Sequence, residues 1–235
     1  MPDTLPRLEA VGVPPAHPPA VVLVLHGGRA HSTESGEHKR LTYRRMVPFA
    51  RMLARRGLAV HFLRYRVRGW NAPKRDALLD AQWALRELDE RYPGVPVVLL
   101  GHSMGGRAAL NAAGAANVTA VCALAPWLDG SDPTAQLAGR TVFIAHGDRE
   151  RFTDPAASYA YATRAKAEGV AICRFELPGA GHFMLAKSRE WSALVRRFVL
   201  GVTRVEPLDP AIANALAQPA PNGLTAQLKE MESAQ

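Results

Sequence analysis

Short apolar runs alternate with longer amphipathic segments along most of this chain. The runs are continuously apolar, which is typical of strands buried on both faces of a sheet. The predicted strands cover residues 20–25, 58–63, 95–100, 118–125, 141–145 and 170–175. Residues 4–13 add a possible antiparallel edge strand, ahead of a proline-rich turn.

The segments between these runs have helical patterns. The predicted helices cover residues 44–56, 76–92, 104–113, 155–168 and 188–200. Gly57 follows the first of them, and Pro155 stands at the first helical position of the fourth, after Asp154. Strand and helix in repeated alternation predict an α/β fold, with a mostly parallel central sheet flanked by helices on both faces.

This pattern predicts a single domain over residues 1–203. From residue 204 to residue 235 the strand pattern stops, and we expect a C-terminal tail that forms short helices or is disordered.

Composition excludes several classes of protein. The 235 residues are 48% hydrophobic, 21% charged and 7% aromatic, which are ordinary globular values. Cys122 and Cys173 each fall in an apolar run and are interpreted as small buried hydrophobes. No apolar run approaches the roughly 20 residues that span a bilayer. The first residues lack the apolar stretch of a signal peptide, so the cytoplasm is the expected location.

The net charge of +8 and the pI near 10 raise the question of nucleic acid. The basic residues are scattered from Arg7 to Arg204, with no dense run and no interleaved aromatics, so no nucleic-acid partner is expected. Attraction of anionic substrates is a milder consequence of the charge. The excess of arginine over lysine is typical of a GC-rich, bacterial genome.

A G-x-S-x-G pattern runs from Gly101 to Gly105, with Ser103 at its centre. It lies between a predicted strand and a predicted helix, the context that a nucleophile elbow requires. The sharp turn needs neighbours without a Cβ atom, and it projects the serine over a helix N-terminus that favours developing negative charge.

With the strand before it, this GHSMGG segment resembles the α/β-hydrolase superfamily over about residues 20–200. The resemblance implies a serine hydrolase that needs no cofactor, with its triad in the chain order serine, acid, histidine. His182 lies in a glycine-rich loop after the last predicted strand, where the family carries its histidine. The imidazole of histidine titrates near neutral pH and can take up and return the serine proton.

Three carboxylates are candidates for the triad acid. The family usually places the acid in the loop after the strand at residues 141–145, and there Glu150 is the third residue after Gly147. Asp148 stands closer to the end of the strand. Asp129, in the loop after residues 118–125, is a further alternative.

The segment His26-Gly27-Gly28-Arg29 follows the first buried strand and resembles the family's oxyanion loop. Backbone N–H groups reach a substrate carbonyl closely only where side chains are absent. The resemblance implies the amide of Met104 as one donor, and the amide of Gly28 or of Arg29 as the other.

The cleft itself is expected to be open. About fifteen residues connect the strand ending near residue 125 to the one starting at residue 141, which leaves no room for a cap domain. Trp127 is the expected apolar wall, and His102 is a second candidate for contact with substrate. Residues 31–45 are interpreted as a polar rim of the cleft, and the spacing of their histidines and glutamates matches no metal-ligand motif. Residues 64–70 form either a border of the cleft or a basic surface loop.

The sequence thus predicts a lidless serine esterase acting on small or short-acyl esters, as a monomer or homodimer, without metal, nucleic acid or membrane. A thioesterase, a peptidase or a perhydrolase would use the same residues. Dienelactone hydrolases are similar in size but use cysteine, where this chain has Ser103. From a different class, a non-catalytic ligand-binding protein on this scaffold is the alternative.

Overall fold

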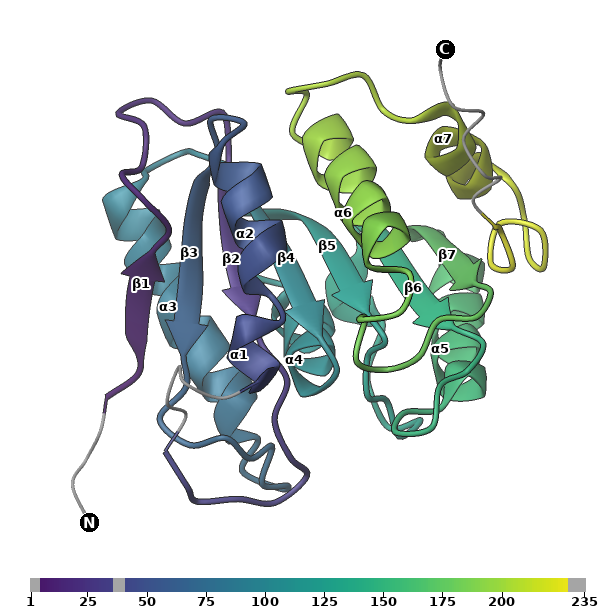
Figure 1. Cartoon of the computed structure of the whole chain (residues 1–235), viewed down its shortest axis with the longest axis horizontal. Helices are drawn as coiled ribbons and strands as arrows, with labels where there is room; N and C mark the ends of the chain where they lie inside the picture. The colour runs from purple at the N-terminus through teal and green to yellow at the C-terminus, as the bar shows by residue number, and fades with distance from the viewer. Residues whose placement is uncertain (1–4, 36–40, 228–235) are drawn as a thin grey trace.

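The structure is a computed structural model that describes residues 5–35 and 41–227. Within these ranges one seven-stranded sheet has the order β1-β3-β2-β4-β5-β6-β7 (Figure 1). Only β1 is antiparallel to its neighbour, β3, and the remaining pairs are parallel. The strands are β1 Arg7–Ala10, β2 Val21–Leu25, β3 Ala59–Arg64, β4 Val97–His102, β5 Val118–Leu124, β6 Thr141–Gly147 and β7 Ala171–Leu177. The predicted α/β architecture and its antiparallel edge are confirmed.

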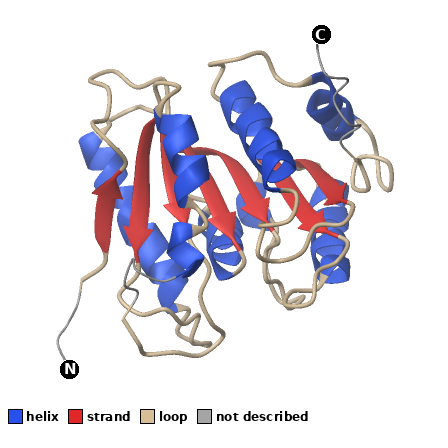
Figure 2. Ribbon diagram, in the orientation of Figure 1, coloured by secondary structure: helices blue, strands red, loops and turns tan. Residues whose placement is uncertain are grey.

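Helices cover both faces of the sheet, as predicted (Figure 2). One face carries α1, α2 and α6, and the other carries α3, α4 and α5. The helices are α1 Leu41–Arg44, α2 Val47–Ala54, α3 Asp76–Arg91, α4 Met104–Ala112, α5 Pro155–Ala167, α6 Ser188–Val202 and α7 Pro210–Ala217. The helix predicted over residues 44–56 is α2, which begins only at Val47 and follows the separate short helix α1, because Pro48 has no N–H to continue a helix and is accommodated in the first turn of α2.

Strand β2 shows why the apolar runs are continuous. Val21, Leu23 and Leu25 pack into the core on the side of α3 and α4, while Val22 and Val24 pack into the core on the side of α2 and α6. Since neither face meets water, every position of the strand is apolar. This doubly covered sheet fixes the carboxyl ends of β2, β4, β6 and β7, from which the candidate site is built.

The described part of the tail packs against the sheet. Asp209 caps α7 by accepting hydrogen bonds from the amides of Ala211 and Ile212. Ile212 is buried in the same core as α6, and Ala226 forms a parallel bridge with Phe175 of β7. This segment is therefore an ordered edge of the fold as far as residue 227, and the prediction for residues 228–235 lies outside the described residues.

The connection between β5 and β6 is fully described and contains only the short 3-10 helix η1, Ala135–Leu137. The prediction that this connection carries no cap domain is confirmed. Over residues 5–35 and 41–227, no helix combines the length and the apolar character needed to cross a membrane.

Candidate active site

Ser103 occupies the sharp turn between β4 and α4. Its φ of 57° and ψ of −121° lie in a region that residues with a side chain seldom adopt. Backbone hydrogen bonds hold the turn: the Ser103 N–H donates to Leu124, and its carbonyl accepts from Arg107 and Trp127. The Ser103 residue is 9% exposed. The strained serine at the end of a central strand has the geometry that the sequence motif predicts.

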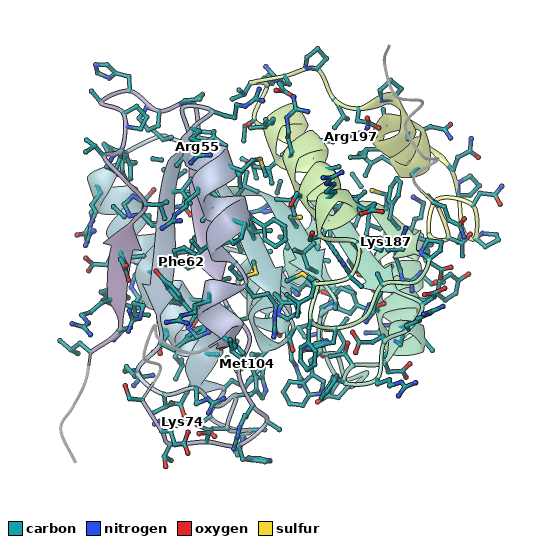
Figure 3. The ribbon with its side chains drawn as sticks, viewed as in Figure 1. Arg55, Phe62, Lys74, Met104, Lys187 and Arg197 are labelled. Atoms are coloured by element: carbon teal, nitrogen blue, oxygen red, sulfur yellow. The ribbon has the colours of Figure 1, made fainter. Side chains whose placement is uncertain are left out.

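The elbow depends on its glycines. A Cβ atom on Gly101 would collide with the backbone of Gly105 and Gly106, and one on Gly105 would collide with the carbonyl of Leu25. The close crossing of the chain, which the G-x-S-x-G pattern predicts, therefore requires glycine at both positions. Met104, labelled in Figure 3, is the first residue of α4 and lies at the arrowhead ends of the central strands, where this crossing occurs.

The loops after β6 and β7 bring a carboxylate to a histidine. The Nδ1 atom of His182 donates to Oε2 of Glu150 over 2.9 Å, and the Glu150 side chain is fully buried. The other oxygen, Oε1, accepts from the amides of Arg151, Phe152 and Thr153 at 2.8, 2.7 and 3.2 Å. Glu150 is thus held by its own loop in contact with His182.

These contacts decide the charge of Glu150. Burial disfavours the carboxylate, but the hydrogen bonds from His182 and from the Phe152 and Thr153 amides outweigh it, and the pKa of Glu150 falls from 4.5 to about 2. Glu150 is therefore ionised at any ordinary working pH and can stabilise an imidazolium on His182.

The two alternative acids lie elsewhere. Asp148 accepts from the amide of Gly179 at 2.7 Å and so ties the acid loop to the histidine loop. Asp129 contacts Arg107 at 2.6 Å and Ser131, and its pKa is lowered to about 2: these hydrogen bonds outweigh the effect of burial. Among the three candidates, only Glu150 has a described contact with His182.

His102 lies between the serine and the histidine loop. Its Nε2 atom is 3.0 Å from the carbonyl oxygen of His182, and the two rings are 4.7 Å apart between centroids. Burial lowers the pKa of His102 to about 3, so its ring is neutral and can donate from Nε2. A ring this enclosed has no surface to offer a substrate, so its position favours a role in placing His182, in contrast to the substrate contact predicted from the sequence.

The two candidate donors of the oxyanion loop, the amides of Gly28 and Arg29, differ in their hydrogen bonds. The amide of Arg29 donates to the carbonyl of Arg68 over 2.8 Å and is therefore occupied. The amides of Gly28 and Met104 have no acceptor among the described residues. A Cβ atom on Gly28 would collide with the Arg68 carbonyl and the Met104 side chain, so the close approach of the loop to the elbow requires glycine here. The geometry favours Gly28 over Arg29.

A stacked cluster fixes the predicted apolar wall. The guanidinium of Arg107 lies 4.6 Å from the ring centroid of Trp70 and 4.7 Å from that of Trp127. Its Nε atom donates to Asp132 over 2.7 Å. Trp127 is half-buried, and its backbone N–H donates to the Ser103 carbonyl, so this residue is anchored to the elbow while its indole packs on Arg107.

The loop at residues 64–70 lies beside the oxyanion loop, since Gly69 bridges to Arg29 and Val67 bridges to Ser35. Of the two alternatives left by the sequence, a cleft border and a plain surface loop, this position favours the first. Of the rim predicted over residues 31–45, residues 36–40 lie outside the described residues. Within 5–35 and 41–227, no three His, Cys, Asp or Glu side chains gather in a way that could hold a metal ion.

Two aromatic residues at the site were missed from the sequence. Phe152 and Phe183 have ring centroids 5.3 and 5.8 Å from that of His182, and both are partly exposed. With Met184 and Leu185 they line a cavity of about 300 Å³ next to His182. The sequence carried one signal for them, which is proximity: Phe183 directly follows His182, and Phe152 stands two residues after Glu150.

A second serine–histidine pair has no access to substrate. Ser158 Oγ is 2.9 Å from Nδ1 of His146, but Ser158 is completely buried and His146 nearly so. This pair is part of the interior that supports the Glu150 loop.

The sequence of residues 21–221 matches the model of the α/β hydrolase family. The chain belongs to the α/β hydrolase family. The match extends over the elbow, the acid loop and the histidine loop, and it continues past α7. The curated proteins compared with this α/β hydrolase include no match.

Solved structures share the fold of this α/β hydrolase. XC6422 from Xanthomonas campestris, described as a serine hydrolase without lid, is 23% identical over 87% of this chain and 90% of its own, with a TM-score of 0.62. Est1E from Butyrivibrio proteoclasticus is 16% identical over 85% and 94%, with a TM-score of 0.64. The esterase Est2 from Thermogutta terrifontis, with propionate bound, is 17% identical over 86% and 91%, with a TM-score of 0.63.

Proposed function

We propose that this α/β hydrolase is a serine esterase that cleaves small or short-acyl carboxylic esters through an acyl-enzyme. The observation that carries the proposal is the buried Glu150 carboxylate bound to Nδ1 of His182, in a chain whose Ser103 occupies the strained elbow. A hydrogen bond at Nδ1 leaves Nε2 as the nitrogen that can accept a proton.

In the proposed reaction the Ser103 hydroxyl attacks the ester carbonyl while His182 takes its proton. Glu150 stabilises the resulting imidazolium. The tetrahedral intermediate expels the alcohol, which receives the proton from His182, and Ser103 is left acylated. Water, activated by the same histidine, then attacks the acyl-enzyme and releases the acid.

The oxyanion would be bound by the amides of Met104 and Gly28. Both are free of described acceptors, and Met104 begins α4, whose N-terminus favours negative charge. A single donor of this type is worth about 3–4 kcal/mol of barrier. The amide of Arg29, already bound to Arg68, is not part of this proposal.

Substrate size follows from the open cleft. No cap covers the elbow on the described β5–β6 connection, and the cavity beside His182 measures about 300 Å³. Trp127 provides a rigid apolar wall. The esterase Est2 was solved with propionate bound, and this short acid supports an ester with a short acyl group for this chain too.

Labelling with a fluorophosphonate probe, followed by peptide mapping, tests the proposal. We expect modification of wild-type protein at Ser103 and none of the Ser103→Ala variant. A parallel panel of p-nitrophenyl esters and acyl-CoA thioesters separates esterase from thioesterase activity. Folded wild-type protein that neither reacts with the probe nor hydrolyses any ester would show a non-catalytic ligand-binding protein.

A further inference from the structure

Positive charge gathers on the aromatic side of His182. The rings of Phe152 and Phe183 are 4.8 Å apart, and the guanidinium of Arg45 lies 4.6 Å from the Phe183 ring centroid. Arg149 and Arg151 line the same cavity as the two phenylalanines. Arginines from two distant parts of the chain therefore surround one apolar surface next to the proposed base.

The two cavity arginines have no described carboxylate partner. Both are exposed, and no ion pair links either of them to another described residue. The acidic neighbours in sequence are engaged elsewhere, Glu150 with His182 and three amides, and Asp148 with the Gly179 amide. Their charge is thus available to a ligand.

The apolar part of the surface is open as well. Phe152 is 64% exposed and Leu185 is 76% exposed. Large apolar side chains gathered in the open beside a reactive group mark a ligand-binding surface. Arginine binds carboxylates with paired, directional hydrogen bonds.

We propose that this cavity selects esters that carry a carboxylate, with the apolar part of the substrate against Phe152 and Phe183 and its carboxylate at Arg149 or Arg151. This inference rests on the proposed esterase function. The positive charge of the chain would then act at this one subsite, as a preference for anionic substrates.

Matched substrate pairs test the preference. The first pair is p-nitrophenyl hydrogen glutarate and its methyl ester, which place a charge or none on the acyl side. The second is the butyrate ester of 4-hydroxybenzoate and its methyl ester, which do so on the alcohol side. We expect kcat/KM to favour the charged member of at least one pair by about ten-fold at low salt, and salt to reduce this ratio.

The Arg149→Gln/Arg151→Gln variant should lose most of that ratio while it still hydrolyses the neutral member. The charge-matched control is Arg55→Gln/Arg86→Gln, since Arg55 follows α2 at the end of the sheet opposite Met104 (Figure 3). Equal use of charged and neutral members by wild type, or equal loss of the ratio in the control, would overturn the inference. Absence of hydrolysis of every ester would instead contradict the esterase function.

A second inference rests on different residues, a buried polar chain that begins at Arg174 of β7. Arg174 is 1% exposed. Its Nη1 atom donates to the carbonyl of Leu224 over 3.0 Å, and its Nε atom donates to Ser158 Oγ over 3.1 Å. The backbone of Arg174 also bonds to Gly223 and Ala226. The C-terminal segment is thereby tied to the guanidinium and to the strand that carries it.

From Ser158 the chain continues to the proposed acid. Ser158 Oγ is 2.9 Å from Nδ1 of His146, and Nε2 of His146 is 3.0 Å from Thr153 Oγ1. Burial holds the pKa of His146 at about 4, so the ring is neutral, and either tautomer serves both hydroxyls. The Thr153 amide donates to Glu150 Oε1. Each member has a partner on both sides.

We infer that this chain makes Thr153 and His146 positioning residues for Glu150, and makes the segment at residues 223–226 part of the support of the site. The inference also rests on the esterase function. Partners within one buried network act cooperatively, so removal of any link should loosen the Glu150 carboxylate in the same way.

A double-mutant cycle tests it. Thr153→Val and Ser158→Ala should each lower kcat by about ten-fold with KM little changed, and the double variant should lose little more than either alone. Thr153→Ser keeps the hydroxyl and should restore activity. Thr163→Val, which removes a hydroxyl bound to Tyr159 within α5, is the matched control.

The proton spectrum supplies a readout that a loss of stability alone would not move. The Nδ1–H of His182 should give a downfield resonance that is lost in Glu150→Gln and shifted in Thr153→Val at temperatures where both are folded. Unchanged kcat and resonance in Thr153→Val, or losses that simply multiply in the double variant, would overturn the inference. Labelling of wild-type Ser103 by the fluorophosphonate probe tests the esterase function independently, so failure of this inference is distinguishable from failure of that function.

Discussion

The Nδ1 atom of His182 lies 2.9 Å from Oε2 of Glu150, while Oε1 of the same carboxylate is held by three consecutive backbone amides. The side chain of a glutamate is one methylene longer than that of an aspartate. Here the extra length lets the carboxylate fold back over its own loop and still reach the histidine. The amides and the imidazole keep it ionised despite its burial.

Glu150→Gln should therefore be the most damaging of the three acid-to-amide changes. A neutral amide neither fixes the imidazole tautomer nor stabilises the imidazolium, and such a change lowers kcat by up to about 10⁴-fold. Asp148→Asn and Asp129→Asn are the controls, because an asparagine oxygen can still accept from Gly179 or Ser131. Steady-state kinetics with p-nitrophenyl butyrate would contradict this assignment if either aspartate change were the crippling one.

Ser103→Ala should abolish turnover and leave the fold intact. Loss of the nucleophile in comparable triads costs about 10⁶-fold in kcat. The alanine relieves no strain, since the backbone angles of the elbow stay the same, so thermal stability should change little. Ser192→Ala on the exposed side of α6 is the control. Activity of Ser103→Ala above a few per cent of wild type would show that another residue is the nucleophile.

The sequence predicted the parts of the site that depend on local pattern. The Ser103 elbow, the His182 loop and the Glu150 loop each follow a strand, and the order of strands in a parallel sheet brings their ends together. It could not choose between Gly28 and Arg29, because that choice depends on the carbonyl of Arg68, forty residues away in the chain. Nor could it give the direction in which the His102 ring points.

The packing of the tail against the sheet was not predicted, for a related reason. Besides the buried side chains of Ile212 and Leu224, its anchors are backbone groups of residues 223–226, and the partner of these groups is the buried Arg174 in β7. The role of an arginine within a mostly apolar strand can be inferred only when its hydrogen-bond partners are known. The sequence therefore predicted short helices or disorder for the tail, and α7 is such a helix, but it could not predict that residues 223–226 pack against β7.

Gly28→Ala should lower kcat far more than it raises KM. Its Cβ atom would collide with the Arg68 carbonyl and the Met104 side chain, and the resulting shift would displace the Gly28 amide, one of the two proposed oxyanion donors. Displacement of one donor costs about 10²–10³-fold in kcat. Gly114→Ala, whose Cβ would meet only Gln136 at ordinary or slightly tight distance, is the control. Equal kcat for Gly28→Ala and wild type would remove Gly28 from the proposed oxyanion hole.

Stability should fall as the pH is lowered from about 6.5 towards 4. Burial lowers the pKa of His26, His61 and His146 from 6.5 to about 4. Between these values the unfolded chain binds protons that the folded one does not, so the free energy of unfolding decreases as pH falls, by about 1.4 kcal/mol per pKa unit and group at most.

Urea unfolding at a series of pH values measures this slope. His61→Gln, in β3 and away from the proposed triad, should make it shallower, whereas His17→Asn on the exposed proline-rich turn should leave it unchanged. A flat profile between pH 6.5 and 4 would show that these imidazoles bind protons equally in the folded and unfolded states, and so would contradict the lowered pKa values.

Acyl-chain length should matter only over the first few carbons. Each methylene contributes about 0.8 kcal/mol while it is removed from water, and nothing once it extends beyond the cleft. The described β5–β6 connection holds no cap that could cover a long chain, and the cavity beside His182 is small, at about 300 Å³. We therefore expect kcat/KM for p-nitrophenyl esters to rise from acetyl to about butyryl or hexanoyl and then to level off or fall. The rate should also show no jump when a substrate exceeds its solubility, because no lid has to open at an interface.

Phe152→Ala, which shortens the apolar surface next to His182, should flatten the rise of kcat/KM with chain length, whereas Leu79→Ala, at an exposed leucine on α3, should not. A preference for palmitoyl over butyryl esters, or activation at an interface, would mean that some other segment closes over the site.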